Sequence, residues 1–141
     1  MITAPTTRLA FVALPEEMVV NETIETYARM QRFEMLSQPP VVFLNRATPP
    51  TFTEDERTLL SRLAASELGE LGSEFVRAGR WEADLEQATA ESQARLAEAL
   101  PGSPVLVPPA PAGGSSHDAV GHVAASLGRL VGIARRKLEW P

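Results

Sequence analysis

Three short, uninterrupted apolar runs constrain the fold of this chain more than any other feature. They span residues 9–14, 41–44 and 105–107. Continuous apolar runs of this length, bounded by turn residues such as the Pro15 that closes the first run, are typical of strands buried on both faces of a sheet. We therefore expect three strands, with the first one covered on both sides.

A helical pattern separates the first two runs. Asn21 is a residue type that commonly caps a helix, and a loose apolar stripe follows it as far as Leu36. Residues 37–40 contain two consecutive prolines, which a helix interior does not tolerate. We expect a helix that is capped at Asn21 and ends at residues 37–40.

Residues 53–100 form a longer helical segment between the second and third runs. Thr53 and Glu56 have the spacing of a capping box. Because glycine is unfavourable inside a helix, we expect a break near Gly79. The helix beyond the break should bury one apolar face, made of Trp81, Leu85, Ala88, Leu96 and Leu100.

The last helical pattern follows a segment rich in proline and glycine. Ser115 or Ser116 can cap it, and its apolar stripe runs from Val120 to Ala134. The order is therefore β-α-β-α-α-β-α, which predicts one α/β domain over residues 1–141, with a small parallel three-stranded sheet and helices on its faces. So small a sheet leaves open edges that a partner could pair with.

Composition excludes several classes of function. The 141 residues carry a net charge of −5, which argues against nucleic acid as a partner. The absence of cysteine excludes disulfides, thiolate metal sites and cysteine catalysis. No apolar run approaches the roughly 18 residues that span a bilayer, and residues 1–8 lack the order of a secretion signal. We expect a cytoplasmic protein without a membrane span.

Four segments, in order, resemble a known family. They are residues 11–18 with the following 21–23, residues 41–46, residues 79–100, and residues 104–111. Together they are similar to the C-terminal part of the anion-transporting, arsenical-pump-type ATPases, which belong to the deviant-Walker class of P-loop NTPases. The resemblance implies the C-terminal half of a doubly wound domain that binds ATP or ADP and works as a nucleotide-gated dimer.

The chain departs from that family where phosphate chemistry is concerned. No Gly-x-x-x-x-Gly-Lys-Ser/Thr loop occurs, and the only lysine, Lys137, precedes Leu138. The family's switch segments have no counterpart in the matched region. Without these parts the phosphoryl group is neither positioned nor stabilised, so we expect no catalytic residues and no ATP hydrolysis by the chain alone. Magnesium would bind only with a partner that supplies the phosphate loop.

The resemblance also implies a base-binding site. Asn45 and Arg46 match the end of the family's apolar strand, where an asparagine contacts adenine; a strand-end turn is the alternative role for Asn45. Glu16 matches the family's Pro-Glu turn, although a solvated turn would place it equally well. The loop residues Pro108, Pro109, Ala110 and Pro111 match the loop that closes over the base, or they form a rigid connector.

Partners follow from the same reasoning. The phosphate-loop half would be another chain or a homo-oligomer partner, and the complete system would serve a membrane pump or a hydrophobic client. The alternative is a stand-alone protein-interaction module, a remnant of such an ATPase, that uses its exposed sheet edge. Metal binding is disfavoured because His117 and His122 are five residues apart, a poor spacing for one helical face. Ser115 and Ser116 have no nucleophile elbow around them.

Overall fold

The computed structural model describes residues 9–108, 120–121, 124–125 and 128. Its elements are, in order, β1 (Ala10–Ala13), α1 (Glu17–Arg32), β2 (Val41–Leu44), α2 (Glu54–Ala64), α3 (Glu70–Ala99) and β3 (Val105–Leu106). The three expected strands and the α/β class are confirmed. The helix expected after Ser115 falls for the most part outside the described residues.

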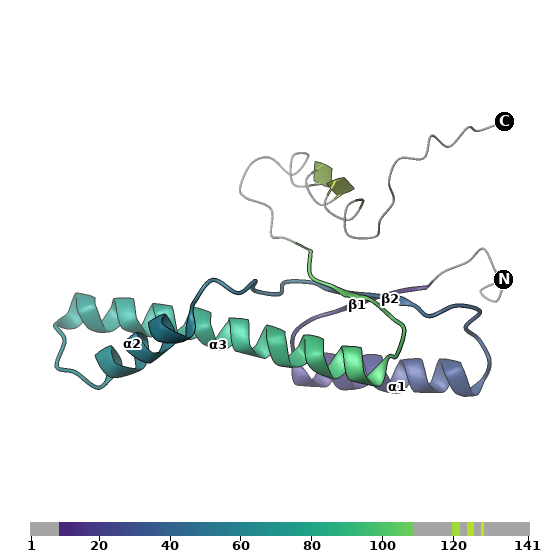
Figure 1. The fold of residues 1–141 in the computed structure, drawn as a ribbon, viewed down its shortest axis with the longest axis horizontal. Helices are drawn as coiled ribbons and strands as arrows, with labels where there is room; N and C mark the ends of the chain where they lie inside the picture. The colour runs from purple at the N-terminus through teal and green to yellow at the C-terminus, as the bar shows by residue number, and fades with distance from the viewer. Residues whose placement is uncertain (1–8, 109–119, 122–123, 126–127, 129–141) are drawn as a thin grey trace.

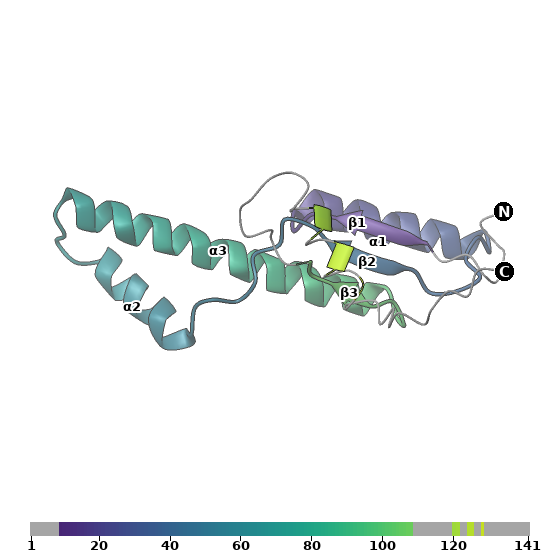
Figure 2. The same ribbon diagram turned by 90° about the horizontal axis from the view of Figure 1, so that it is seen from above.

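The three strands form a parallel sheet with β2 in the centre. Ala13 of β1 is level with Leu44 of β2, and Phe43 of β2 is level with Leu106 of β3. Successive strands are added in one direction, so right-handed connections place α1 and α3 on the same face of the sheet. Figures 1 and 2 show both helices on that face.

The expectation that the first strand is buried on both faces is wrong. Ala13, which points towards the helices, is 1% exposed, whereas Val12 on the other face is 68% exposed. The reason is topological, because both helices that follow the strands lie on one side. The described part of the chain therefore leaves the second face of β1 open.

The hydrophobic core lies between the sheet and these two helices. Its fully buried side chains come from α1 (Val20), β2 (Val42 and Leu44) and the C-terminal end of α3 (Leu96 and Leu100, its C-cap). Among the described elements, β1 adds Ala13 and β3 adds Val105 to this core, whereas α2 contributes no residue to it.

The bounds of α1 differ from the expected ones at both ends. Glu16, and not Asn21, occupies the N-cap position, and its side chain makes no cap hydrogen bond. Burial of Val20 in the core draws the turn before Asn21 into the helix, which outweighs the capping preference of Asn21. The helix ends at Arg32, before residues 37–40, and the chain turns through Glu34 in the left-handed region (φ 52°).

Helices α2 and α3 form a hairpin that extends beyond the sheet (Figure 1). The capping box is confirmed: Glu56 N–H donates to Thr53 Oγ1, and Thr53 N–H donates to Glu56 Oε2. The break near Gly79 is wrong, because α3 continues through it. A Cβ atom at position 79 would lie 2.9 Å from Leu60 Cδ2, so this glycine permits the close approach of α2.

The prediction of the buried apolar face of α3 is also only partly correct. Leu96 and Leu100 are buried, but Trp81 is 67% and Leu85 36% exposed. The buried residues of the middle of α3 are instead Ala83, Glu86, Thr89 and Ser92. The C-terminal part of α3 packs on the sheet, whereas α2 and the β2–α2 connector cover a different side of the helix further towards its N-terminus. None of the helices in the described ranges is both long enough and apolar enough to cross a membrane.

Candidate functional site

The carboxyl ends of the three strands lie together at one end of the sheet. Glu16 follows β1, Asn45 and Arg46 follow β2, and Pro108 follows β3 after one intervening residue. Because the strands are parallel and in register, these residues come to the same edge, where doubly wound sheets bind ligands. Pro109, Ala110 and Pro111 lie outside the described residues.

Asn45 is the centre of this edge. Its backbone N–H donates to the carbonyl of Ala13 at 2.8 Å and so extends the β1–β2 ladder by one bond. The residue is exposed, and its side-chain amide makes no hydrogen bond within the described part of the chain. The amide therefore offers both a donor and an acceptor to a ligand.

Arg46 adopts a backbone conformation that side chains other than glycine rarely take. Its φ is 54°, in the left-handed region, and its side chain is exposed. For a residue with a Cβ atom this conformation costs about 1–2 kcal/mol. Such strain is found preferentially at functional sites, and here it directs the chain away from the sheet immediately after Asn45.

Glu16 and Pro108 complete the edge. Glu16 is exposed, and its carbonyl accepts the N–H of Val20 at 2.9 Å, which begins α1. Its carboxylate is not used as a helix cap and is therefore open to solvent. Pro108 is half-buried. The edge thus presents one amide, one guanidinium and one carboxylate, all at the surface.

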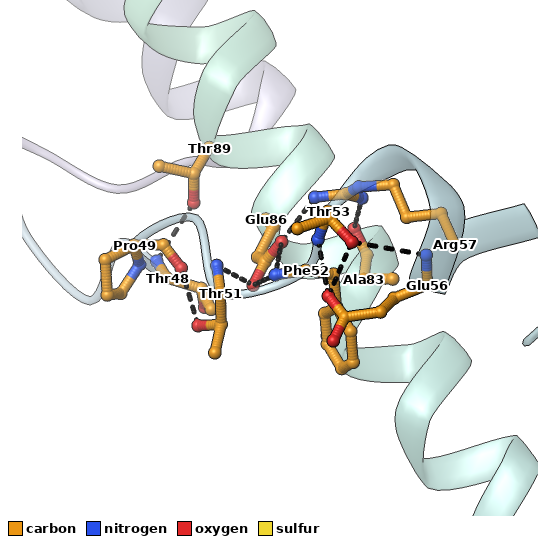
Figure 3. Close-up of polar contacts among 10 residues, drawn as sticks. All are labelled: Thr48, Pro49, Thr51, Phe52, Thr53, Glu56, Arg57, Ala83, Glu86 and Thr89. Carbon is orange, nitrogen blue, oxygen red and sulfur yellow. Dashed lines mark hydrogen bonds and ion pairs between the residues drawn. The ribbon is translucent and has the colours of Figure 1, made fainter.

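The connector between Arg46 and α2 is held against α3 by a buried polar cluster, shown in Figure 3. Thr48 N–H donates to Thr89 Oγ1 at 3.0 Å. Thr51 N–H donates to Glu86 Oε1 at 2.6 Å, and Phe52 N–H donates to the same oxygen at 3.3 Å. These bonds anchor the connector whose first residues are Asn45 and Arg46.

Glu86 is the buried charge of this cluster. Its side chain is 1% exposed and forms an ion pair with Arg57, which also donates to the carbonyl of Ala83 at 3.1 Å. Burial by itself raises the pKa of Glu86. The hydrogen bonds from Thr51 and Phe52 and the charge of Arg57 outweigh burial, so the pKa of Glu86 lies below its ordinary value.

The sequence analysis missed Glu86 as a buried residue because it placed only apolar residues on the buried face of this helix. The available signal was spacing. Ala83, Glu86, Thr89 and Ser92 recur every three residues on α3, and all four are small or can accept hydrogen bonds. A stripe of this kind is compatible with burial against a backbone segment rather than against side chains.

The predicted site is an open edge rather than an enclosed pocket. Two pockets, of ≈ 370 Å³ and ≈ 400 Å³, lie elsewhere, one between α2 and α3 and the other around Pro39 and Pro101. Neither is lined by Glu16, Asn45, Arg46 or Pro108. Among the described residues, no three His, Cys, Asp or Glu side chains are grouped as a metal ion would require.

No family model matches the chain. No curated protein matches its sequence.

Proposed function

We propose that this chain is the base-side portion of an arsenical-pump-type ATPase-like protein, which contributes adenine-nucleotide binding and subunit contacts but does not hydrolyse ATP by itself. The observation that carries the proposal is the convergence of Glu16, Asn45, Arg46 and Pro108 at the carboxyl end of one parallel sheet. Ligands of doubly wound folds bind at that end of the sheet.

The side chain of Asn45 fits the role of a base contact. An amide can donate to one ring nitrogen and accept from the exocyclic amine of adenine at the same time. Its backbone N–H is bonded to the carbonyl of Ala13, so the ladder holds the main chain from which this side chain extends. Arg46, the next residue, turns the chain through a left-handed backbone conformation (φ 54°).

The open geometry of the edge implies weak binding. An exposed amide competes with water for every hydrogen bond, so a base bound to it gains little free energy. The sequence provides no glycine-rich loop for the phosphates. Affinity in the working protein would therefore depend on a partner that supplies the phosphate loop, and magnesium would bind there.

The test is calorimetric titration of the chain with ATP and ADP, each with and without magnesium. The expected result is weak binding that does not depend on magnesium and is lost in Asn45→Ala. Gln93→Ala is the matched control, because Gln93 is an exposed amide on α3 without a hydrogen bond in the described part of the chain. Binding that is absent at millimolar nucleotide, or equal in Asn45→Ala, would contradict the proposal.

A second candidate, a protein-interaction module, is favoured by the open second face of β1; on the same face of β2, Val41 is only 5% exposed. Val12 is 68% exposed on that face, and β1 and β3 are the outer strands of the described sheet. Exposed apolar strands invite pairing with another chain. Analytical ultracentrifugation of Val12→Lys tests it: loss of self-association relative to the unmodified chain supports this function, and a monomer in both cases argues against it.

A further inference from the structure

A pocket lies between α2 and α3. The hairpin that these helices form extends beyond the sheet (Figure 2). Its volume is ≈ 370 Å³. Leu63 of α2 and Val76 of α3 are among its apolar lining residues. A pocket of this size is within the usual range for small organic ligands. The base-binding residues proposed above take no part in it.

The pocket is a consequence of how the two helices meet. At Gly79 they approach so closely that a single added Cβ atom would contact Leu60. Residues 65–69 connect the helices, and the pocket lining extends from α3 across to this connection. The pocket is therefore lined by the end of α2, by the connection between the helices and by α3.

The polar residues at the pocket give it a net positive charge. Arg77, Arg80 and Asp84 contribute to its lining. Arg80 forms no ion pair or hydrogen bond with any described residue, and the nearest acidic partner of Arg77 is Glu74, at 3.7 Å. The lining therefore carries two guanidinium groups and one carboxylate, and of the two guanidinium groups only that of Arg77 is in an ion pair, with Glu74. The net charge of the chain is −5.

Trp81 gives the pocket an aromatic wall. Its side chain lines the pocket, although 67% of it is exposed. An indole beside guanidinium groups provides a flat apolar surface for a hydrocarbon body while the charges hold a polar head.

We propose that this pocket binds a small carboxylate with an apolar body, such as a medium-length alkyl carboxylate. The hydrocarbon would lie against Leu63, Val76 and Trp81, and the carboxylate would accept hydrogen bonds from Arg80 and Arg77. Guanidinium groups bind carboxylates in a two-pronged geometry that fixes the head group. Asp84 repels the same head group and thereby limits the affinity.

Trp81 makes the proposal directly measurable. In the full-length Trp140→Phe chain Trp81 is the only tryptophan, and its fluorescence reports on the pocket. Titration with octanoate should give a saturable change. Acetate, which has the head group alone, should give none, and octanol, which has the chain alone, should bind at least tenfold more weakly. Equal responses to octanol and octanoate, or no saturable response to octanoate, would overturn the proposal.

Three substitutions in the same background fix the role of the charges. Arg80→Gln should weaken octanoate binding about tenfold, the effect of losing one charge-assisted hydrogen bond. Asp84→Asn should tighten it, because a repelling carboxylate is removed. Arg32→Gln on α1, an exposed arginine distant in sequence from the pocket, should leave it unchanged. If Asp84→Asn does not bind octanoate more tightly than the Trp140→Phe chain, or if Arg80→Gln binds it equally well, a carboxylate does not bind at this position.

Discussion

The carboxylate of Glu86 accepts the backbone N–H of Thr51 at 2.6 Å, across 35 residues of sequence. This bond joins the middle of α3 to the connector that leaves the predicted base site. Since Arg57 of α2 binds the other oxygen of the same carboxylate, one side chain ties together the connector, α2 and α3. The hairpin and the sheet edge are thus linked through Glu86.

Removal of that carboxylate should destabilise the protein. Glu86→Ala leaves Arg57 without its carboxylate partner and the N–H groups of Thr51 and Phe52 without an acceptor. Loss of one member of a buried ion pair costs about 3–5 kcal/mol, and we expect about 3 kcal/mol because Arg57 remains partly exposed. Urea unfolding followed by circular dichroism measures the change.

Two further variants show whether the loss of stability comes from the Glu86–Arg57 ion pair or from any substitution of a glutamate on α3. Glu98→Gln changes an exposed carboxylate of α3 that forms no hydrogen bond or ion pair with a described residue, and it should alter stability by less than about 0.5 kcal/mol. Replacement of both Glu86 and Arg57 by apolar residues should cost less than the single Glu86→Ala change. If Glu86→Ala unfolds at the same urea concentration as the unmodified chain, the cluster does not hold the connector.

The contribution of Glu86 to stability should depend on pH in a defined direction. Its pKa in the folded protein is lower than the value of 4.5 expected when it is unfolded. The unfolded state therefore takes up the proton first, and the stabilisation is complete above about pH 4.5 and is lost as the pH falls through the lowered pKa. The difference in unfolding free energy between the unmodified chain and Glu86→Gln should be constant near neutrality and decrease below about pH 4.5. A difference that grows on acidification would contradict the ionised state of Glu86.

The strands could be predicted from the sequence because their signal is local. Residues 41–44 are apolar without interruption, and Val41–Leu44 is the observed strand. The capping box at Thr53 is also local and was confirmed. The predictions of a cap at Asn21 and of a break near Gly79 were wrong. At both positions, contacts with residues elsewhere in the fold outweigh the local preference of the residue. Burial of Val20 decides the first case, and the approach of Leu60 decides the second.

The candidate site was predictable in part for a similar reason. Parallel strands bring their carboxyl ends together, so placing Glu16, Asn45 and Pro108 at one edge needed only the element order. The anchoring of that edge was predictable only to the extent that the stripe containing Glu86 indicates burial against backbone. Its partners, the backbone N–H groups of Thr51 and Phe52, are 35 and 34 residues away, and the stripe does not say which segment supplies them.

Replacement of Gly79 tests the close approach of the hairpin helices. Alanine is better than glycine inside a helix by about 1 kcal/mol. In the unmodified chain this gain should be offset, because the new Cβ would lie 2.9 Å from Leu60 Cδ2 and force that side chain to move. Gly79→Ala should therefore be neutral or slightly destabilising alone, and stabilising by about 1 kcal/mol in a Leu60→Ala background. Equal effects in both backgrounds, measured by urea unfolding, would show that the helices do not meet at this glycine.

The two faces of the sheet should respond differently to truncation. Val42 is completely buried between the sheet and its helices, whereas Val12 is 68% exposed. Val42→Ala removes buried methyl groups and should cost about 2 kcal/mol. Val12→Ala should cost less than about 0.5 kcal/mol in dilute solution. Thermal unfolding of both variants compares them directly, and a large cost for Val12→Ala would mean that another part of the chain or a second copy covers the open face.

Arg46 allows the strain at the predicted site to be separated from its function. The left-handed φ of 54° costs an arginine about 1–2 kcal/mol, and a glycine adopts it freely. The added flexibility of the unfolded chain offsets about 0.5–1 kcal/mol of this gain, so Arg46→Gly should stabilise the protein by up to about 1 kcal/mol. Glu34→Gly, at a φ of 52° outside the site, is the matched control and should stabilise by a similar amount.

Nucleotide titration then distinguishes the two positions. Arg46→Gly should bind ATP more weakly than Glu34→Gly, because only the first removes a guanidinium beside Asn45. If both variants are stabilised and bind equally, Arg46 shapes the turn and does not contact the ligand.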